Sequence, residues 1–254
     1  MTISTKDRPV TAAPDLPEEL GLLQRTVRQF VEEKLRPHER EIEEREEIPR
    51  ALLDEIAAMG FFGIGFAEEV GGQGFGKLGY VVLVEQLERA NAAIGNVVGG
   101  SIGLCATAIS LGGDDAQKHR FLPDLLSAKR IGAYALSEPG AGSDAGSLRT
   151  RARREGDAYV LEGAKTFITN APIADEFVVF ANLDPDAGSK GITAFVVDRD
   201  TPGLRIGPHD RKMGLHGSTT AQIFFTDMHV GADRRLGDEG RGFPLALRTL
   251  DHGR

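Results

Sequence analysis

The sequence predicts an α+β protein, with an all-helical N-terminal domain followed by an antiparallel β-barrel or sandwich domain. Apolar residues recur at helical spacing through the first half, whereas β-rich runs separated by Pro, Gly and Asp follow residue 130. None of these runs is followed by an amphipathic helix, so we expect no parallel βαβ unit. With 254 residues, of which 41% are hydrophobic, the chain can build one large domain or two modest ones.

The first helix is predicted by apolar residues at helical spacing, namely Leu20, Leu23, Val27, Phe30 and Val31. The charged run 32–47 continues this helix as a solvated face, with a kink expected at Pro37. Pro49 suits the first turn of a second helix, and Gly60 suits its C-terminal end.

Three further segments complete the helical half. After a glycine-rich loop at 71–74, residues 77–91 predict an amphipathic helix from Leu78, Val81, Val82, Val84 and Leu87. Residues 92–113 carry no charge, but their Gly, Ser, Thr and Asn content favours a buried helix over a membrane span. Asp114 is expected to cap a helix over 115–121.

The β half begins with a short apolar run at 131–137. Residues 148–154 alternate in chemistry, 155–157 have the composition of a hairpin turn, and the return strand starts at 159–161. Further strands are predicted over 177–181, 192–197 and 222–226, and residues 242–254 are helical again.

These patterns divide the chain into four parts. We expect a disordered lead-in at 1–16, a helical domain at 17–130, a β-domain at 131–240, and the start of a C-terminal helical domain at 241–254. The lead-in has no apolar h-region and no twin arginine, so we expect a cytoplasmic protein.

Composition argues against several functional classes. The formal net charge of -8 offers no basic face for nucleic acid. The single cysteine, Cys105, is expected to be a small buried hydrophobe. The six histidines are scattered without metal-ligand spacing, so we predict no metal site. We also expect no membrane partner.

The segment YALSEPGAGSDAG, at 134–146, contains a G-x-G-x-x-A pattern from Gly140 to Ala145. A Rossmann phosphate loop requires a strand before it and a helix after it. Residues 146–151 have no helical apolar stripe, so we reject the NAD interpretation. Glycine backbone and hydroxyl groups could instead hold a flavin or its pyrophosphate. An ordinary glycine-rich surface turn is the alternative.

Several motifs together resemble the acyl-CoA dehydrogenase family. They are YALSEPGAGSD at 134–144, GAKTFITN at 163–170, EEVGG at 68–72, KMG at 212–214, LGDEGRGF at 236–243 and LDHGR at 250–254. The resemblance covers nearly all of the chain after the lead-in. It implies an N-terminal helical domain, a middle β-domain and a C-terminal helical bundle, of which the bundle would follow Arg254.

The resemblance also implies FAD and a reaction. That reaction is α,β-dehydrogenation of an acyl-CoA thioester, by abstraction of the α proton and hydride transfer to flavin N5. The expected partners are the acyl-CoA substrate, an electron-transferring flavoprotein and, in the intact enzyme, further copies of the same chain.

Family positions carry over to named residues. The expected cofactor-binding residues are Tyr134, Leu136, Ser137, Gly142, Ser143, Phe167, Ile168 and Thr169. Ser137 stands where the family usually has Thr, Phe167 stands where Trp is common, and Thr169 would lie near flavin N5. Ser143, Asp251 and Arg254 are the expected substrate-binding residues.

The catalytic base has no candidate in this sequence. One subgroup of the family uses a Glu directly before the arginine that matches Arg254, but here that position is Gly253. In most other members the base lies further on, so we expect it beyond Arg254. Glu138 matches a structural position in the family. Two alternatives stay open at this point: a non-catalytic truncated module that binds a nucleotide or a partner, and an acyl-CoA oxidase of the same fold.

Overall fold

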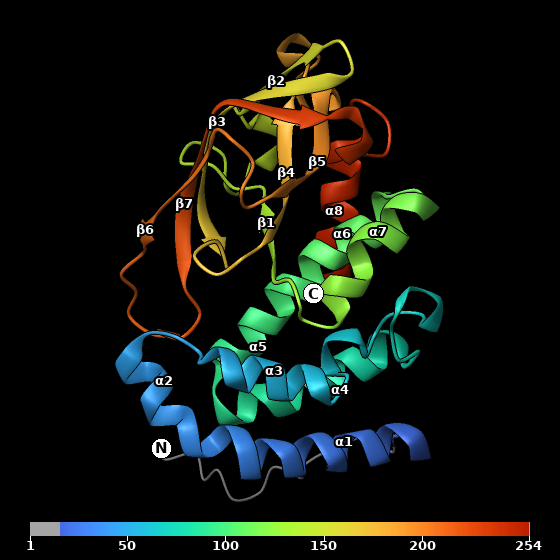
Figure 1. Ribbon diagram of the computed structural model, residues 1–254, viewed down its shortest axis with the longest axis vertical. Coiled ribbons are helices and arrows are strands. Elements are labelled where there is room, and N and C mark those ends of the chain that lie inside the picture. Colours follow the sequence, from blue (N-terminus) through green and yellow to red (C-terminus); the bar gives the residue numbers. More distant parts are fainter. Residues whose placement is uncertain (1–15, 254) are drawn as a thin grey trace, which may run out of the picture.

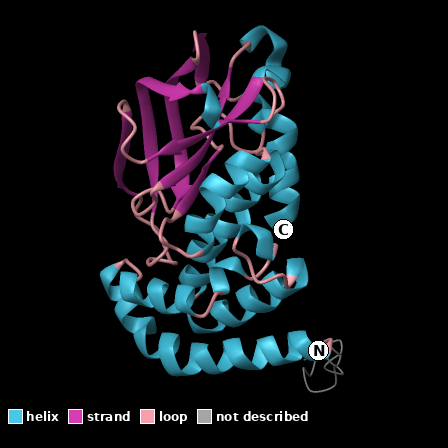
Figure 2. Cartoon of the chain, turned by 45° about the vertical axis from the view of Figure 1, so that its right-hand side comes forward, coloured by secondary structure: helices cyan, strands magenta, loops and turns pink. Residues whose placement is uncertain are grey.

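The computed structural model describes residues 16–253, in which helices form the first half and a sheet forms most of the second (Figures 1 and 2). A last helix returns beside the sheet. In chain order the helices are α1 (Glu18–Phe30), α2 (Glu39–Arg45), α3 (Arg50–Ala58), α4 (Gly76–Ala90), α5 (Ala92–Val98), α6 (Thr107–Gly112), α7 (Asp115–Leu126) and α8 (Gly242–Gly253).

The predicted kink near Pro37 is confirmed. Between α1 and α2 the chain forms a π-helical turn over Val31–Leu35 and a 3₁₀ turn over Arg36–His38. Proline has no backbone N–H to donate, so the regular α-helical ladder cannot pass through it. As a result α2 leaves the direction of α1 (Figure 1).

Two local signals in the helical half also hold. Pro49 directly precedes α3, and Gly60 follows this helix with a φ of 73°. Only glycine adopts that backbone conformation without strain, so it ends the helix efficiently.

The predicted buried face of α4 is wrong in part, because Leu78 and Val81 are 49% and 51% exposed. The face that α4 buries is instead the one that carries Gly79, Val82, Leu83, Gln86, Leu87 and Ala90.

The uncharged segment forms one helical stretch, Ala92–Gly112, in which a π-helical segment, η6 (Gly99–Ala106), joins α5 to α6. By length and composition alone this stretch could cross a membrane, but 78% of its most apolar window is buried inside the protein. Cys105 lies in η6 and is fully buried, and burial raises the pKa of its thiol well above the usual value. The next helix, α7, is capped by Asp114 as predicted and runs past the predicted end to Leu126.

Strands pair mainly in the antiparallel sense and form one sheet. They are β1 (Gly132–Ala135), β2 (Arg151–Glu155), β3 (Ala158–Thr169), β4 (Glu176–Asn182), β5 (Ile192–Asp198), β6 (Leu204–His209), β7 (Thr220–Gly231) and β8 (Arg235–Leu236). Their order is β6-β7-β3-β2-β4-β5-β8, and β1 pairs with β4 outside this path. The pairings β1–β4 and β2–β4 are parallel, which departs from the purely antiparallel expectation.

The two faces of β1 contribute to two different cores. Ala133 and Ala135 point into the apolar interior of the β-domain, among residues such as Phe177. Tyr134, and Leu136 directly after β1, pack instead in the core shared with the helices. This alternation follows from the period of two in a strand. It places the loop after β1 where the sheet meets the helices.

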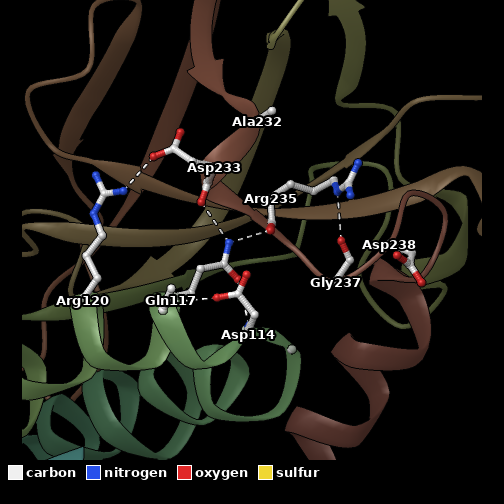
Figure 3. Close-up of a pocket in the computed structure, with 11 residues that line it drawn as sticks. Asp114, Gln117, Arg120, Ala232, Asp233, Arg235, Gly237 and Asp238 are labelled. Carbon is white, nitrogen blue, oxygen red and sulfur yellow. Dashed lines mark hydrogen bonds and ion pairs between the residues drawn. The ribbon is translucent and has the colours of Figure 1, made fainter.

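A hollow of about 550 Å³ lies where the start of α7 faces the segment before α8 (Figure 3). Its polar groups already bond to one another. The Gln117 amide nitrogen donates to the carbonyl oxygens of Asp233 at 2.9 Å and of Arg235 at 2.8 Å. Arg120 forms an ion pair with Asp233 at 2.7 Å. We therefore interpret this hollow as a junction between the helical half and the sheet.

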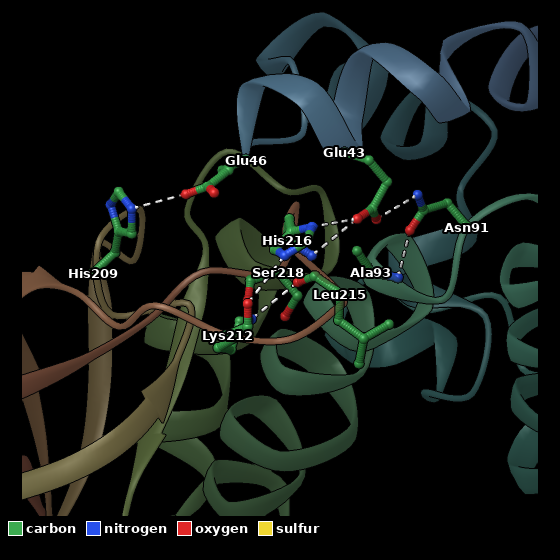
Figure 4. Close-up of polar contacts among 9 residues, drawn as sticks. All are labelled: Glu43, Glu46, Asn91, Ala93, His209, Lys212, Leu215, His216 and Ser218. Atoms are coloured by element: carbon green, nitrogen blue, oxygen red, sulfur yellow. Dashed lines mark hydrogen bonds and ion pairs between the residues drawn. The ribbon is translucent and has the colours of Figure 1, made fainter.

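A second junction joins α2 to the loop between β6 and β7 (Figure 4). One ring nitrogen of His216 lies 2.8 Å from a Glu43 oxygen, and the other lies 3.1 Å from the Lys212 carbonyl oxygen. His209 lies 3.2 Å from Glu46. Both histidines therefore contact the helical half.

Candidate functional site

The glycine-rich loop that follows β1 is held by reciprocal backbone bonds. The amide of Glu138 donates to the Ala141 carbonyl at 3.0 Å, and the Ala141 amide donates to the Glu138 carbonyl at 3.1 Å. After a short 3₁₀ turn at Ala145–Ser147 the chain enters β2. A strand rather than a helix follows the loop, so the loop does not have the structure of a Rossmann phosphate loop.

The end of β3 presents an aromatic side chain to solvent. The pairing register of β3 with β7 shifts between Lys165 and Ile168, which marks a bulge. Within it Phe167 has a φ of 56° and is 71% exposed. A left-handed backbone at a bulky residue is uncommon, and bulges near functional sites re-aim side chains.

These two segments meet at one cavity of about 480 Å³. All eight expected cofactor-binding residues line it: Tyr134, Leu136, Ser137, Gly142, Ser143, Phe167, Ile168 and Thr169. A backbone hydrogen bond of 2.9 Å from the Thr166 amide to the Ser137 carbonyl ties the segments together. The structure therefore brings together residues that the sequence places on two separate motifs.

Sequence reasoning did not assign the remaining wall of the cavity. Gly100 and Leu104 come from the π-helical segment η6, and Leu247 and Leu250 come from α8. Ala145 completes the lining. The signal was present, since Gly100 and Leu104 lie four residues apart in the uncharged segment, on one face of a helix. The sequence did not show which face would meet the sheet.

Helix α8 closes the cavity against the sheet. It contacts η6, α6 and β5. The Tyr134 hydroxyl donates a hydrogen bond of 3.3 Å to the carbonyl oxygen of Ala246 in α8. Burial raises the pKa of the Tyr134 phenol far above its ordinary value, so this hydroxyl keeps its proton and its donor role.

The cavity combines hydrogen-bonding groups with an apolar wall. Ser137, Ser143 and Thr169 bring hydroxyls, and Phe167 brings an exposed ring face. Among the residues 16–253 that the structure describes, those lining the cavity include no carboxylate and no histidine. The site can therefore bind and orient a planar polar ring, but its lining supplies no proton acceptor of the usual kind.

The expected substrate-binding residues do not all lie at the cavity. Ser143 lines the cavity, whereas Asp251 lies just past the lining residue Leu250 and is exposed. The carbonyl oxygen of Asp251 accepts a hydrogen bond of 3.2 Å from Lys77. Arg254 lies outside the described residues. A side chain at Gly253 would start 3.2 Å from Leu104, a residue of the cavity wall.

A buried ion pair lies behind the loop. Lys165 is completely buried and its ammonium donates to the Glu138 carboxylate at 2.8 Å and to the Leu136 carbonyl at 3.1 Å. Burial lowers the pKa of Lys165 to about 8, against the attraction of Glu138. Burial acts to raise the pKa of Glu138, but Lys165 and backbone donors lower it overall. Both groups are therefore charged at neutral pH.

Comparison with known families assigns both halves of the chain. Residues 17–129 match the N-terminal domain of acyl-CoA dehydrogenases, and residues 133–228 match the middle domain. The chain belongs to the acyl-CoA dehydrogenase family. It is 40% identical to a short-chain specific acyl-CoA dehydrogenase of Clostridium acetobutylicum over 240 residues, which cover 94% of this chain and 63% of the relative.

Two further proteins are similar over most of this chain. Caffeyl-CoA reductase-Etf complex subunit CarC of Acetobacterium woodii is 38% identical over 93% of this chain and 63% of its own. The structure of butyryl-CoA dehydrogenase from Megasphaera elsdenii superimposes with a TM-score of 0.90 at 37% identity, covering 94% of this chain and 63% of that chain. The chain thus spans about 63% of the length of these relatives.

Proposed function

We propose that this chain is the flavin-binding part of an FAD-dependent oxidoreductase that dehydrogenates acyl-CoA thioesters between the α and β carbons. The observation that carries the proposal is the cavity of about 480 Å³, to which both family motifs contribute. We also propose that the chain divides into an N-terminal helical domain at 17–130, a middle β-domain at 131–240 and the start of a C-terminal helical domain at 241–254. The cytoplasmic location stays a prediction.

The lining fits an isoalloxazine ring. A built Cβ on Gly142 meets nothing within 4 Å, so a ligand can approach this backbone closely. Phe167 offers a ring face for stacking, and the hydroxyls of Ser137 and Thr169 can bond the polar edge of the flavin. When bound, the flavin supplies the two-electron chemistry, and the protein supplies orientation and electrostatics.

We assign substrate contacts to three residues. In this proposal Ser143 touches both flavin and acyl-CoA, while Asp251 and Arg254 contact the CoA part or the cofactor. Leu104, Leu247 and Leu250 give the cavity an apolar wall, which would shield one side of a bound ligand from water and strengthen the hydrogen bonds made there. The base that removes the α proton is assigned to a position beyond Arg254.

The proposed partners follow the family. An electron-transferring flavoprotein is proposed to take the electrons, since the relative from Acetobacterium woodii is named as a subunit of an Etf complex. We also propose a homo-oligomer for the intact enzyme.

The test is anaerobic addition of butyryl-CoA to the flavin-loaded protein that the complete gene encodes. The visible absorbance of the flavin should bleach without oxygen, because the acyl chain is the reductant. A bound flavin whose spectrum does not change with butyryl-CoA or longer acyl-CoA substrates would favour a non-catalytic module. Reoxidation by air with stoichiometric peroxide, faster than by electron-transferring flavoprotein, would favour an oxidase.

A further inference from the structure

The side chain of Lys165 links the two segments that line the cavity: it stands on β3 and bonds the loop after β1. Lys165 stands in β3 directly before the bulge that presents Phe167. Its ammonium reaches Leu136 and Glu138, which flank Ser137 in the loop after β1. A full charge at a completely buried position is rare unless it is paired, and here the pair joins two site segments.

Glu138 is itself fixed from the far side. One of its carboxylate oxygens accepts the Arg149 amide at 2.6 Å, and the other accepts the Thr150 amide at 2.9 Å as well as the Lys165 ammonium. Charge-assisted bonds of this kind are short and directional. The Glu138 carboxylate therefore ties the start of the loop to its end, and Lys165 bonds the start of the loop directly.

Phe167 needs such support. Its backbone lies in the left-handed region, which is unfavourable for a bulky side chain and persists only where surrounding contacts enforce it. The ring is 71% exposed, so packing around the ring cannot enforce the conformation. The pairing of β3 with β7 flanks the bulge at Lys165 and resumes at Ile168. Beside this pairing, the Lys165 bonds and the bond from the Thr166 amide to Ser137 hold the residues just before Phe167.

We propose that Lys165, held by Glu138, is a positioning residue that fixes the bulge and thereby the Phe167 ring against the cavity. The proposal rests on the proposed function for the identity of the ligand, a flavin. It does not rest on it for the geometry, because the bulge and the buried pair exist in the protein alone. Neither residue lines the cavity.

The experiment uses a single fluorophore. The chain contains no tryptophan, so Phe167→Trp introduces a unique reporter at the aromatic position. Its steady-state anisotropy and emission maximum are measured without ligand in three proteins: the Phe167→Trp parent, the parent with Lys165→Met, and the parent with Lys129→Met. Lys129 is exposed, so its replacement makes the same chemical change away from the site. Far-UV circular dichroism sets a temperature at which all three are folded.

Lys165→Met should lower the anisotropy toward that of the denatured protein, while Lys129→Met leaves it unchanged. In proteins that retain Phe167, Lys165→Met should also weaken FAD binding about tenfold. If Lys165→Met does not fold, Glu138→Gln replaces it, because the amide keeps an acceptor but loses the charge. Unchanged anisotropy in a folded variant would overturn the proposal and leave the pair a purely structural role. Failure of the unmodified chain to bind FAD would count against the proposed function, and the anisotropy would still decide this inference.

Discussion

The backbone amide of Thr166 lies 2.9 Å from the carbonyl oxygen of Ser137 and donates a hydrogen bond to it. This bond joins the end of β3 to the loop after β1. The Ser137 side chain lies on the wall of the cavity, and none of the described residues that line this cavity is charged. The hydroxyl is therefore available to a ligand with a polar edge.

Replacing Ser137 by Ala should weaken FAD binding about fivefold, which corresponds to roughly one hydrogen bond of ~1 kcal/mol. Ser137→Thr keeps the hydroxyl and should bind FAD about as tightly as the unmodified chain. Fluorescence titration of FAD measures both. Ser147→Ala is the matched control, because Ser147 is exposed and bonds the Asp144 carbonyl outside this cavity. An affinity of Ser137→Ala equal to that of the control would remove the hydroxyl from the site.

Asn170 connects the helical half to the sheet directly behind the cavity. Its buried amide nitrogen donates to the carbonyl oxygens of Val97 at 2.9 Å and Gly132 at 3.0 Å. Asn170→Ala should lower the free energy of unfolding by about 2–4 kcal/mol, because two buried carbonyls lose their donor. Urea denaturation measures this change.

Backbone strain can be separated from the lost bonds at the same position. Asn170 has a φ of 67°, a conformation that glycine accepts more readily than alanine. Asn170→Gly therefore removes the amide without the strain. If Asn170→Gly were as stable as the unmodified protein, the two hydrogen bonds would not hold the halves together.

Glu176 predicts a pH dependence of stability. Its carboxylate is completely buried, and burial raises its pKa to about 7, although Arg130 lies 3.3 Å away and acts against this rise. In the unfolded chain the group titrates near its ordinary value of 4.5. The folded state therefore binds more protons between these pH values, so the stabilising contribution is complete below pH 4.5 and is lost as pH rises through 7.

Glu176→Gln isolates this contribution from other titrating groups. At pH 8 the variant should be more stable than the unmodified protein by up to about 3 kcal/mol, and near pH 4 the two should be alike. Urea denaturation across this pH range measures the difference. A difference that does not change with pH would show that the folded-state pKa of Glu176 is not raised.

Local signals predicted the elements well where one residue decides the backbone. Asp114 and Gly60 mark helix ends by hydrogen bonding and by glycine's freedom at positive φ, which need no tertiary contact. The buried face of α4 was harder to predict, because Leu78 and Val81 are apolar yet exposed. Strand β6 (LRIGPH) was missed, since its Gly and Pro are typical of turns.

The site was predictable to the extent that it lies on motifs. The eight expected cofactor-binding residues of the two motifs meet at one cavity, but the wall from η6 and α8 depends on tertiary packing that no local pattern encodes. Lys165 gave no signal as a buried charge, because the sequence does not show that Glu138 will face it. Buried pairs of this kind become visible only once the fold brings two strands together.

The central claim is that the loop after β1 and the end of β3 together hold a flavin. Its most direct test compares FAD titrations of Gly142→Trp and Gly214→Trp. Quenching of the flavin fluorescence reports binding in both titrations. Built Cβ atoms at both glycines meet nothing within 4 Å, so both variants should fold, but only Gly142 lines the cavity. We predict that Gly142→Trp abolishes FAD binding while Gly214→Trp binds like the unmodified chain. Equal FAD affinity in the two variants would contradict the claim.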